Sequence, residues 1–180
     1  MLSKAEWEDI HQRALERFEA AGVILTDEEA ENLEIADLGL DRFEEVGLTA
    51  ITYVNNDRYC AKELLLFPHQ VLPEHAHPPF DDYPGKQETL RCRSGTVYLY
   101  VEGDPVDSPS VTPPFHTEHY TVGHEIVLEP GDQHTLDPDT KHWFAAGAAG
   151  AVISEFSSPS FDAKDVFTDP AIERIPDQPY

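Results

Sequence analysis

Apolar side chains recur every three or four residues at the beginning of the chain. The positions concerned are Trp7, Ile10, Ala14, Leu15 and Phe18. Side chains at this spacing share one face of a helix. Ser3 is a suitable N-cap, and Gly22 follows where a helix can end. The pattern predicts an amphipathic helix over residues 3–21.

A second, shorter helix is predicted in the stretch "TDEEAENLEIADLGL", residues 26–40. Thr26 or Asp27 can cap it, acidic residues fill its first turn and Gly39 lies near its end. Residues 1–47 are therefore expected to form an N-terminal helical segment.

From about Leu48 the pattern changes to short stretches rich in β-branched and aromatic residues, separated by Pro, Gly, Asp and Asn. The stretches are "LTAITYV", "YCAKELLLF", "TVYLYVEG", "HYTVGHEIVLEPG", "KHWFAAG" and "AVISEFS". Many short strands at regular spacing are typical of a sandwich or barrel. We expect a mostly β fold, with the barrel formed by residues 48–157.

Two segments lack such a pattern. The Pro-rich residues 101–119 are expected to form a loop, because proline neither donates to a strand ladder nor continues a helix. Residues 158–180 are mostly irregular and are expected to pack as a tail on the barrel or on a partner subunit. The length of 180 residues suits a single domain, so residues 1–180 are taken as one.

Composition narrows the possible partners. The formal net charge is −23, with 12 Lys and Arg against 35 Asp and Glu, and no basic cluster interrupts the acidic background. Nucleic acids and anionic membranes are therefore excluded as expected partners, since both require a positive surface. The chain has no apolar run long enough for a bilayer and no signal-peptide pattern, so a soluble, cytoplasmic protein is expected. Cys60 and Cys92 are expected to be reduced.

The candidate chemistry begins with a His-x-His pair. His75 and His77 would project from the same face of a strand, near enough to bind one cation. Glu88 adds a carboxylate, with six residues between it and the turn expected at Gly95. Nearby acids could replace it as the ligand, namely Glu74, Asp81 and Asp82.

A further ligand is expected from a distant strand, with His134 and His142 as the candidates. At this point the sequence resembles the cupin superfamily, whose two motifs have the forms G…HxH…E…G and G…PxG…H. The matching residues are His75, His77, Glu88 and Gly95 for the first motif, and Gly131, Pro138 and His142 for the second. The resemblance favours His142 over His134 and implies a single cupin barrel, a jelly-roll or double-stranded β-helix. The His77–Glu88 interval is longer than usual, and Thr140 replaces a common glycine.

A closer resemblance covers nearly the whole chain. Stretches such as "NNDRYCAKELLLFP", "GKQETLRCRSGTVYLYVEG" and "TKHWFAAG" are similar to the cupin-type D-lyxose isomerases. That family tolerates the longer interval between the second histidine and the glutamate. The resemblance implies a metal-dependent aldose–ketose isomerase that converts D-lyxose to D-xylulose and D-mannose to D-fructose. It also implies Mn²⁺ as the preferred ion, although the donor set would admit Co²⁺, Fe²⁺, Ni²⁺ or Zn²⁺.

Isomerisation through a cis-enediol requires a base that reaches both C1 and C2 of the sugar. Glu155 is the candidate, because it shares a strand face with apolar Ala151 and Ile153. Lys62 is the second catalytic candidate, near a developing oxyanion. Since Lys62 and Glu63 point to opposite faces of a strand, only one of them can enter the barrel.

Four further residues are expected to contact the sugar. Lys86, Gln87 and Tyr120 could bind hydroxyl groups, and Trp143 beside His142 could wall the pocket or belong to the core.

Two other functions use the same ligand set: an Fe²⁺-dependent cupin dioxygenase, and a non-catalytic cupin that binds a metal and a sugar. Because cupins commonly pair through a barrel sheet, a homodimer is expected.

Overall fold

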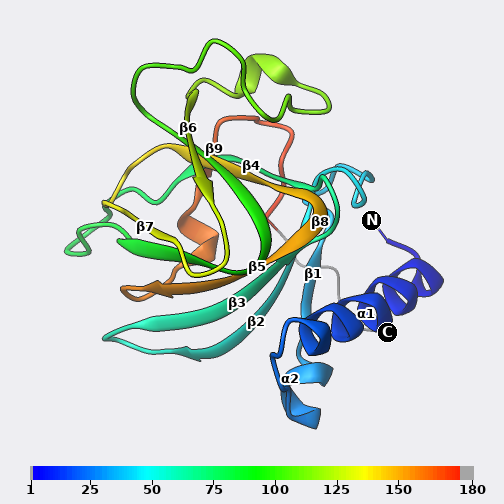
Figure 1. Ribbon diagram of the computed structural model, residues 1–180. Coiled ribbons are helices and arrows are strands. Elements are labelled where there is room, and N and C mark those ends of the chain that lie inside the picture. Colours follow the sequence, from blue (N-terminus) through cyan, green and yellow to red (C-terminus); the bar gives the residue numbers. More distant parts are fainter. Residues whose placement is uncertain (1, 175–180) are drawn as a thin grey trace.

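The computed structural model describes residues 2–174. It shows a curled β-sheet, with two α-helices from the N-terminal part of the chain beside it (Figure 1). The helices are α1 (Lys4–Ala20) and α2 (Asp27–Glu31), with short 3-10 turns η1 (Thr117–His119) and η2 (Asp162–Lys164). The strands are β1 (Glu34–Ala36), β2 (Leu48–Asn55), β3 (Cys60–Leu66), β4 (Val71–Ala76), β5 (Glu88–Val101), β6 (His124–Leu128), β7 (Gln133–Leu136), β8 (His142–Ser157) and β9 (Val166–Phe167).

Two long strands close the barrel. β8 pairs with β3, β4 and β5, and β5 also pairs with β6 and β7, so that one nine-stranded sheet curls back on itself. This arrangement confirms the predicted mostly β, cupin-type fold. The separate strands expected at residues 141–147 and 151–157 are wrong, because β8 runs through both. The pairing of β8 with β5 shifts register at two places, so β8 continues as one strand and is not divided in two by a turn.

The turn expected at Gly95 is also wrong, since β5 continues through it. Gly95 has φ +78° and lies at a register shift opposite Ala151. A Cβ at this position would lie 1.9 Å from the carbonyl oxygen of Gly150. The glycine therefore lets two strand backbones approach closely where the sheet bends.

Gly95→Ala is expected to lower the free energy of unfolding by about 3 kcal/mol or more, because both a left-handed φ and a backbone clash oppose the methyl group. Gly131→Ala is the matched control: Gly131 has φ +102°, but no atom lies within 4 Å of the place that a methyl group would take. Gly131→Ala should lower the free energy of unfolding by only about 1 kcal/mol. Urea unfolding measures the free energy of unfolding of both variants. Equal losses of stability in the two would contradict the role given to the close approach of Gly95 to Gly150.

Helix α1 covers the outer face of the sheet, as its apolar stripe predicts. Ser3 and Glu6 form a capping box at its start, while Trp7 and Phe18 are among the buried residues that pack against the outward face of the sheet. The second helix is shorter than expected. α2 ends at Glu31, and Glu34–Ala36 pairs with β2 instead, because Ile35 and Ala36 become fully buried there.

Alternation along β3 decides which residues face the barrel interior. Lys62 and Leu64 point inward, while Glu63 points to the outer face and bonds to Ser154. Residues 102–116 of the Pro-rich segment form a loop as predicted, whereas Val101 is the last residue of β5 and Thr117–His119 form η1. None of the helices in residues 2–174 is long and apolar enough to span a membrane.

The C-terminal tail is more ordered than its sequence suggests. Residues 158–174 contain η2 and β9, and β9 pairs with β4 at the end of the barrel (Figure 1). Phe167 stacks on the ring of His75, with ring centroids 5.3 Å apart. The part of the predicted tail beyond residue 174 lies outside the described residues.

Candidate metal centre and active site

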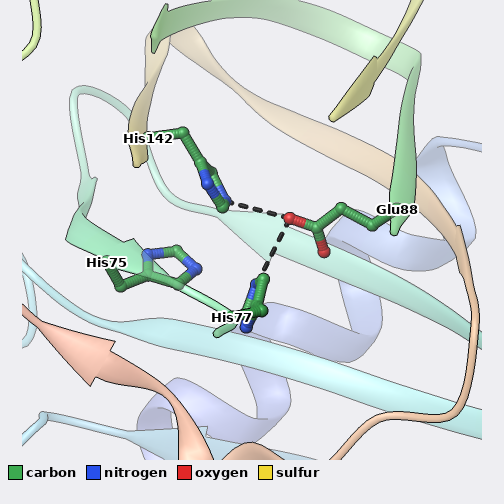
Figure 2. A group of neighbouring side chains, drawn as sticks. All are labelled: His75, His77, Glu88 and His142. Carbon is green, nitrogen blue, oxygen red and sulfur yellow. Dashed lines mark ion pairs between the residues drawn. The ribbon is translucent and has the colours of Figure 1, made fainter. Parts of the chain in front are cut away.

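Four side chains from β4, β5, β8 and the residue after β4 point toward one another (Figure 2). His75 lies in β4 and His77 directly follows it, Glu88 is the first residue of β5, and His142 is the first residue of β8. One potential ligand atom from each lies within 4.8 Å of the others, and all four side chains are buried (Figure 2). The structure thus brings together the set singled out from the sequence.

Hydrogen bonds at the far side of each imidazole orient it toward the centre. Nδ1 of His75 lies 2.8 Å from the backbone carbonyl oxygen of Pro73. Nδ1 of His142 lies 2.9 Å from the backbone carbonyl oxygen of Thr140. Carbonyl oxygens only accept, so each Nδ1 must carry the proton and donate it. Each Nε2 is then left with a lone pair, as a metal ligand requires.

His77 is oriented in the same way by a carboxylate. Its Nδ1 lies 2.6 Å from Oδ1 of Asp165, a residue of the tail. Hydrogen bonding of a ligand imidazole to a carboxylate fixes its orientation and raises its basicity. The tail therefore supports the candidate metal centre directly.

The inner atoms of the cluster lack satisfactory hydrogen bonds. Oε1 of Glu88 lies 2.9 Å from Nε2 of His142 and 3.3 Å from Nε2 of His77 (Figure 2). Despite these short distances, the angles do not suit hydrogen bonds, and Oε1 of Glu88, Nε2 of His77 and Nε2 of His142 are buried without a hydrogen-bond partner. Lone pairs that converge in a buried place require a cation or protons between them, so the residues fit a divalent metal ion.

The electrostatics of the cluster suit metal ligation. Burial lowers the pKa of His75 well below its usual value, with further lowering from His142 and His77, so that His75 stays neutral. Burial opposes ionisation of Glu88, but Lys86 and His77 outweigh it and hold the pKa of Glu88 well below its usual range.

His77 behaves differently from His75. Burial lowers its pKa, but the attraction of Glu88 and the hydrogen bond to Asp165 outweigh this and raise the pKa to about 9. Binding of a divalent ion by His77 must therefore displace a proton at neutral pH.

Lys86 connects the candidate metal centre to the candidate base. Its Nζ lies 2.6 Å from Oε2 of Glu88 and 2.6 Å from Oε1 of Glu155, and all three side chains are buried. Burial disfavours the charged ammonium, but Glu155 and Glu88 outweigh that effect and raise the pKa of Lys86. Lys86 remains a cation fixed between two carboxylates. It also lines a pocket whose walls include His75, His77 and Glu88.

Lys62 lies in the same pocket, opposite Glu155 in the β3–β8 register. Its Nζ is 2.9 Å from both carboxylate oxygens of Asp162. Burial lowers its pKa, but Glu155 and Asp162 outweigh this and raise it. The two catalytic candidates, Lys62 and Glu155, thus line the same pocket, and Lys62 carries its positive charge there.

Three residues proposed as sugar contacts do not line this pocket. Gln87 is exposed and donates to Asp137 at 3.0 Å. Trp143 stacks on Tyr100, with Tyr120 against its edge, in a separate part of the core. Strand alternation explains two of these placements, because neighbours of the inward Glu88 and His142 must point away. Phe144, two residues beyond His142, lines the pocket instead.

The alternative ligands also lie apart from the cluster within residues 2–174. Glu74 is buried but bonds to Thr121 and Thr168 instead, and Asp81 and Asp82 are exposed. His134 lies in β7 and is not part of the cluster.

The tail supplies pocket residues that the sequence did not reveal. They are Asp162, Asp165, Phe167 and Arg174. The stretch "FDAKDVF" carries two acids three residues apart, but nothing in its periodicity indicates that their side chains reach a pocket of the barrel. Arg174 pairs with Glu34 and lies 3.6 Å from Asp162, so the tail is tied to β1 as well.

Comparisons with known proteins agree with the site. The family model described as D-lyxose isomerase matches residues 28–178. The chain is 54% identical over 178 residues to the D-lyxose/D-mannose isomerase of Thermosediminibacter oceani, covering 98% of each, and 55% identical over 172 residues to the D-lyxose ketol-isomerase of Cohnella laeviribosi, covering 95% of this chain and 94% of that protein.

A solved structure shares the fold at much lower identity. The L-ribose isomerase of Acinetobacter sp. DL28 in complex with L-ribose superposes with a TM-score of 0.80 at 14% identity, covering 95% of this chain and 94% of the other. The long family match and the high identities to two relatives decide the family. The chain belongs to the D-lyxose isomerase family.

Proposed function

We propose that the protein is a metal-dependent aldose–ketose isomerase that interconverts D-lyxose and D-xylulose, and D-mannose and D-fructose. The observation that carries the proposal is the buried group of three imidazoles and one carboxylate, joined through Lys86 to the buried Glu155. The relatives named for D-lyxose and D-mannose isomerisation support the substrates.

His75, His77, Glu88 and His142 would hold the ion, with Mn²⁺ as the proposed metal. When bound, a divalent ion would act as a Lewis acid toward the carbonyl and hydroxyl oxygens at C1 and C2 of the open-chain sugar. Three nitrogen donors and one oxygen donor are compatible with Mn²⁺ and with its neighbours in the transition series.

Glu155 is assigned the proton transfer. Its carboxylate would remove the proton from C2 of the aldose, leaving a cis-enediolate, and return that proton to C1. The proton of the O2 hydroxyl would pass to O1, so that the carbonyl moves from C1 to C2 and the ketose forms. Lys86 fixes the position of this carboxylate through the 2.6 Å contact. Lys62, across the strand pair from Glu155, would donate to a substrate oxygen as negative charge develops.

The pocket walls would exclude water from the reaction. Leu64, Leu72, Phe144 and Phe167 supply apolar surface beside the charged groups. A buried Lys–Glu pair next to the ligands suits acid–base chemistry better than oxygen activation, which supports isomerisation over the dioxygenase alternative. The homodimer, the cytoplasmic location and the single-domain boundaries expected from the sequence stay predictions.

The test is an aldose panel assayed with chelator-stripped protein and again after addition of Mn²⁺, without oxygen and in D₂O. Turnover of D-lyxose and D-mannose should require the metal and not oxygen, and solvent deuterium should enter the product at C1 or the recovered aldose at C2. Oxygen consumption would instead support a dioxygenase. Sugar binding without turnover or deuterium uptake would support a non-catalytic cupin.

A further inference from the structure

Glu74 is a buried carboxylate that the proposed reaction does not use. It lies beside the ligand His75 in β4, with 1% of its surface exposed. Its two oxygens accept hydrogen bonds from two other segments of the chain. The donors are the backbone N–H of Thr121 at 2.5 Å, the Thr121 hydroxyl at 2.8 Å, the backbone N–H of Val122 at 2.9 Å and the Thr168 hydroxyl at 2.7 Å.

These bonds join three parts of the molecule. Thr121 and Val122 end the long loop after β5, whereas Thr168 belongs to the tail immediately after β9. The backbone N–H of Thr168 also donates to the backbone oxygen of Glu74 at 3.0 Å. Lys141 contributes weakly, since its Nζ lies 3.9 Å from the carboxylate but 3.1 Å from the Thr121 hydroxyl.

The tail segment held in this way is the one that reaches the metal ligands. Phe167, next to Thr168, stacks on His75, and Asp165 accepts the hydrogen bond of His77. The two β9 residues between Asp165 and Thr168 pair with β4. Four hydrogen bonds to one buried carboxylate are strong constraints, because each unsatisfied donor would carry a desolvation cost.

We propose that Glu74 is a positioning residue that holds the tail so that Asp165 and Phe167 fix His77 and His75 for metal binding. The inference rests on the proposed metal-dependent function and deepens it. Within residues 2–174, no hydrogen bond joins the Glu74 carboxylate to either ligand ring. It acts through Thr168 and the short β9 strand, and it also fixes the loop end at Thr121.

Two variants test the role. Glu74→Ala removes all four acceptor bonds, and Thr168→Val removes only the tail hydroxyl while keeping the shape of the side chain. Hydrogen exchange of residues 165–169 in the metal-free protein should become about tenfold faster or more in Glu74→Ala. Mn²⁺ affinity, measured by calorimetry, should fall about 10- to 100-fold, as for other losses of support to a metal ligand. Thr168→Val should change both in the same direction by less.

A conservative variant and a control separate positioning from general damage. Glu74→Gln should stay near the parent, because its amide can accept from the two N–H groups and donate to the two hydroxyls. Glu125→Ala is the matched control, since Glu125 accepts hydrogen bonds from Ser110 of the same loop, and no hydrogen bond or ion pair joins it to residues 158–174. It should leave tail exchange and Mn²⁺ affinity unchanged.

An Asp165→Asn background provides the decisive comparison. If Glu74 acts through Asp165, Glu74→Ala should weaken Mn²⁺ binding much less in that background than in the parent. Fully additive losses, or Mn²⁺ affinity unchanged in both Glu74→Ala and Thr168→Val, would overturn the proposal for Glu74 alone. A parent protein that binds no divalent ion would instead refute the metal-dependent function, while hydrogen exchange of residues 165–169 would still show whether Glu74 holds the tail.

Discussion

Glu88→Ala is expected to abolish most Mn²⁺ binding and sugar isomerisation together. The carboxylate would be the oxygen ligand beside the three imidazoles of the cluster, and it also pairs with Lys86 at 2.6 Å and faces His77 and His142. Loss of a supporting residue outside a metal centre already costs about 10- to 100-fold in affinity, so loss of a ligand should cost at least about 100-fold. Calorimetric Mn²⁺ titration and D-lyxose turnover measure the two effects.

The control for this variant is Glu102→Ala. Glu102 is an exposed acid just after the other end of β5, and its loss should leave metal binding and turnover unchanged. Circular dichroism should show that Glu88→Ala remains folded, because Lys86 keeps its second partner Glu155. A folded Glu88→Ala protein that binds Mn²⁺ as tightly as the parent would contradict the assignment of Glu88 as a ligand.

Glu155→Gln should separate metal binding from chemistry. The substitution keeps the size of the side chain and leaves the four proposed ligands intact, so Mn²⁺ affinity should stay within a few-fold of the parent. Turnover should fall by roughly 10²- to 10⁴-fold, the usual contribution of a general base. Exchange of the C2 proton with D₂O should fall in parallel, since the same proton transfer starts both processes.

Glu63→Gln is the matched control for Glu155→Gln. Glu63 is another buried glutamate of the same sheet, but it points to the outer face and bonds to Ser154 and Arg93. Its replacement should leave turnover unchanged. If Glu155→Gln retained nearly the parent turnover while binding metal normally, another residue would have to be the base, and Lys62 would be the next to replace.

Much of the site followed from short-range patterns. The spacing of His75 and His77 places both rings on one side of the chain, and the resemblance to cupins selected Glu88 and His142 from several candidates. The same alternation rule, applied outward from Glu88, would have placed Lys86 inside and Gln87 outside. The sequence pattern alone gave both residues the same role as sugar contacts, whereas the structure puts Lys86 between two carboxylates and Gln87 at the surface.

The strand boundaries were less predictable. Turn-forming glycines suggested breaks at Gly95 and between the two halves of β8, yet both strands continue through bulges. A positive φ at glycine serves a turn and a bulge equally well, so a local pattern cannot distinguish them. The same limit applies to Glu34–Ala36, where pairing with a strand twelve or more residues away replaces the predicted helix.

By itself, the sequence determined the capped first helix, the β-rich region, the opposite faces of strand neighbours such as Lys62 and Glu63, and the residue types able to bind a metal. These features depend on neighbours within a few positions along the chain. The sequence left open whether the tail packs on the barrel or on a partner subunit. Only the tertiary structure decided that the tail pairs with β4 and that Asp165, Phe167 and Glu74 lie where they can support the proposed ligands. Such contacts join residues about ninety positions apart, and their free energy appears only when barrel closure brings the segments together.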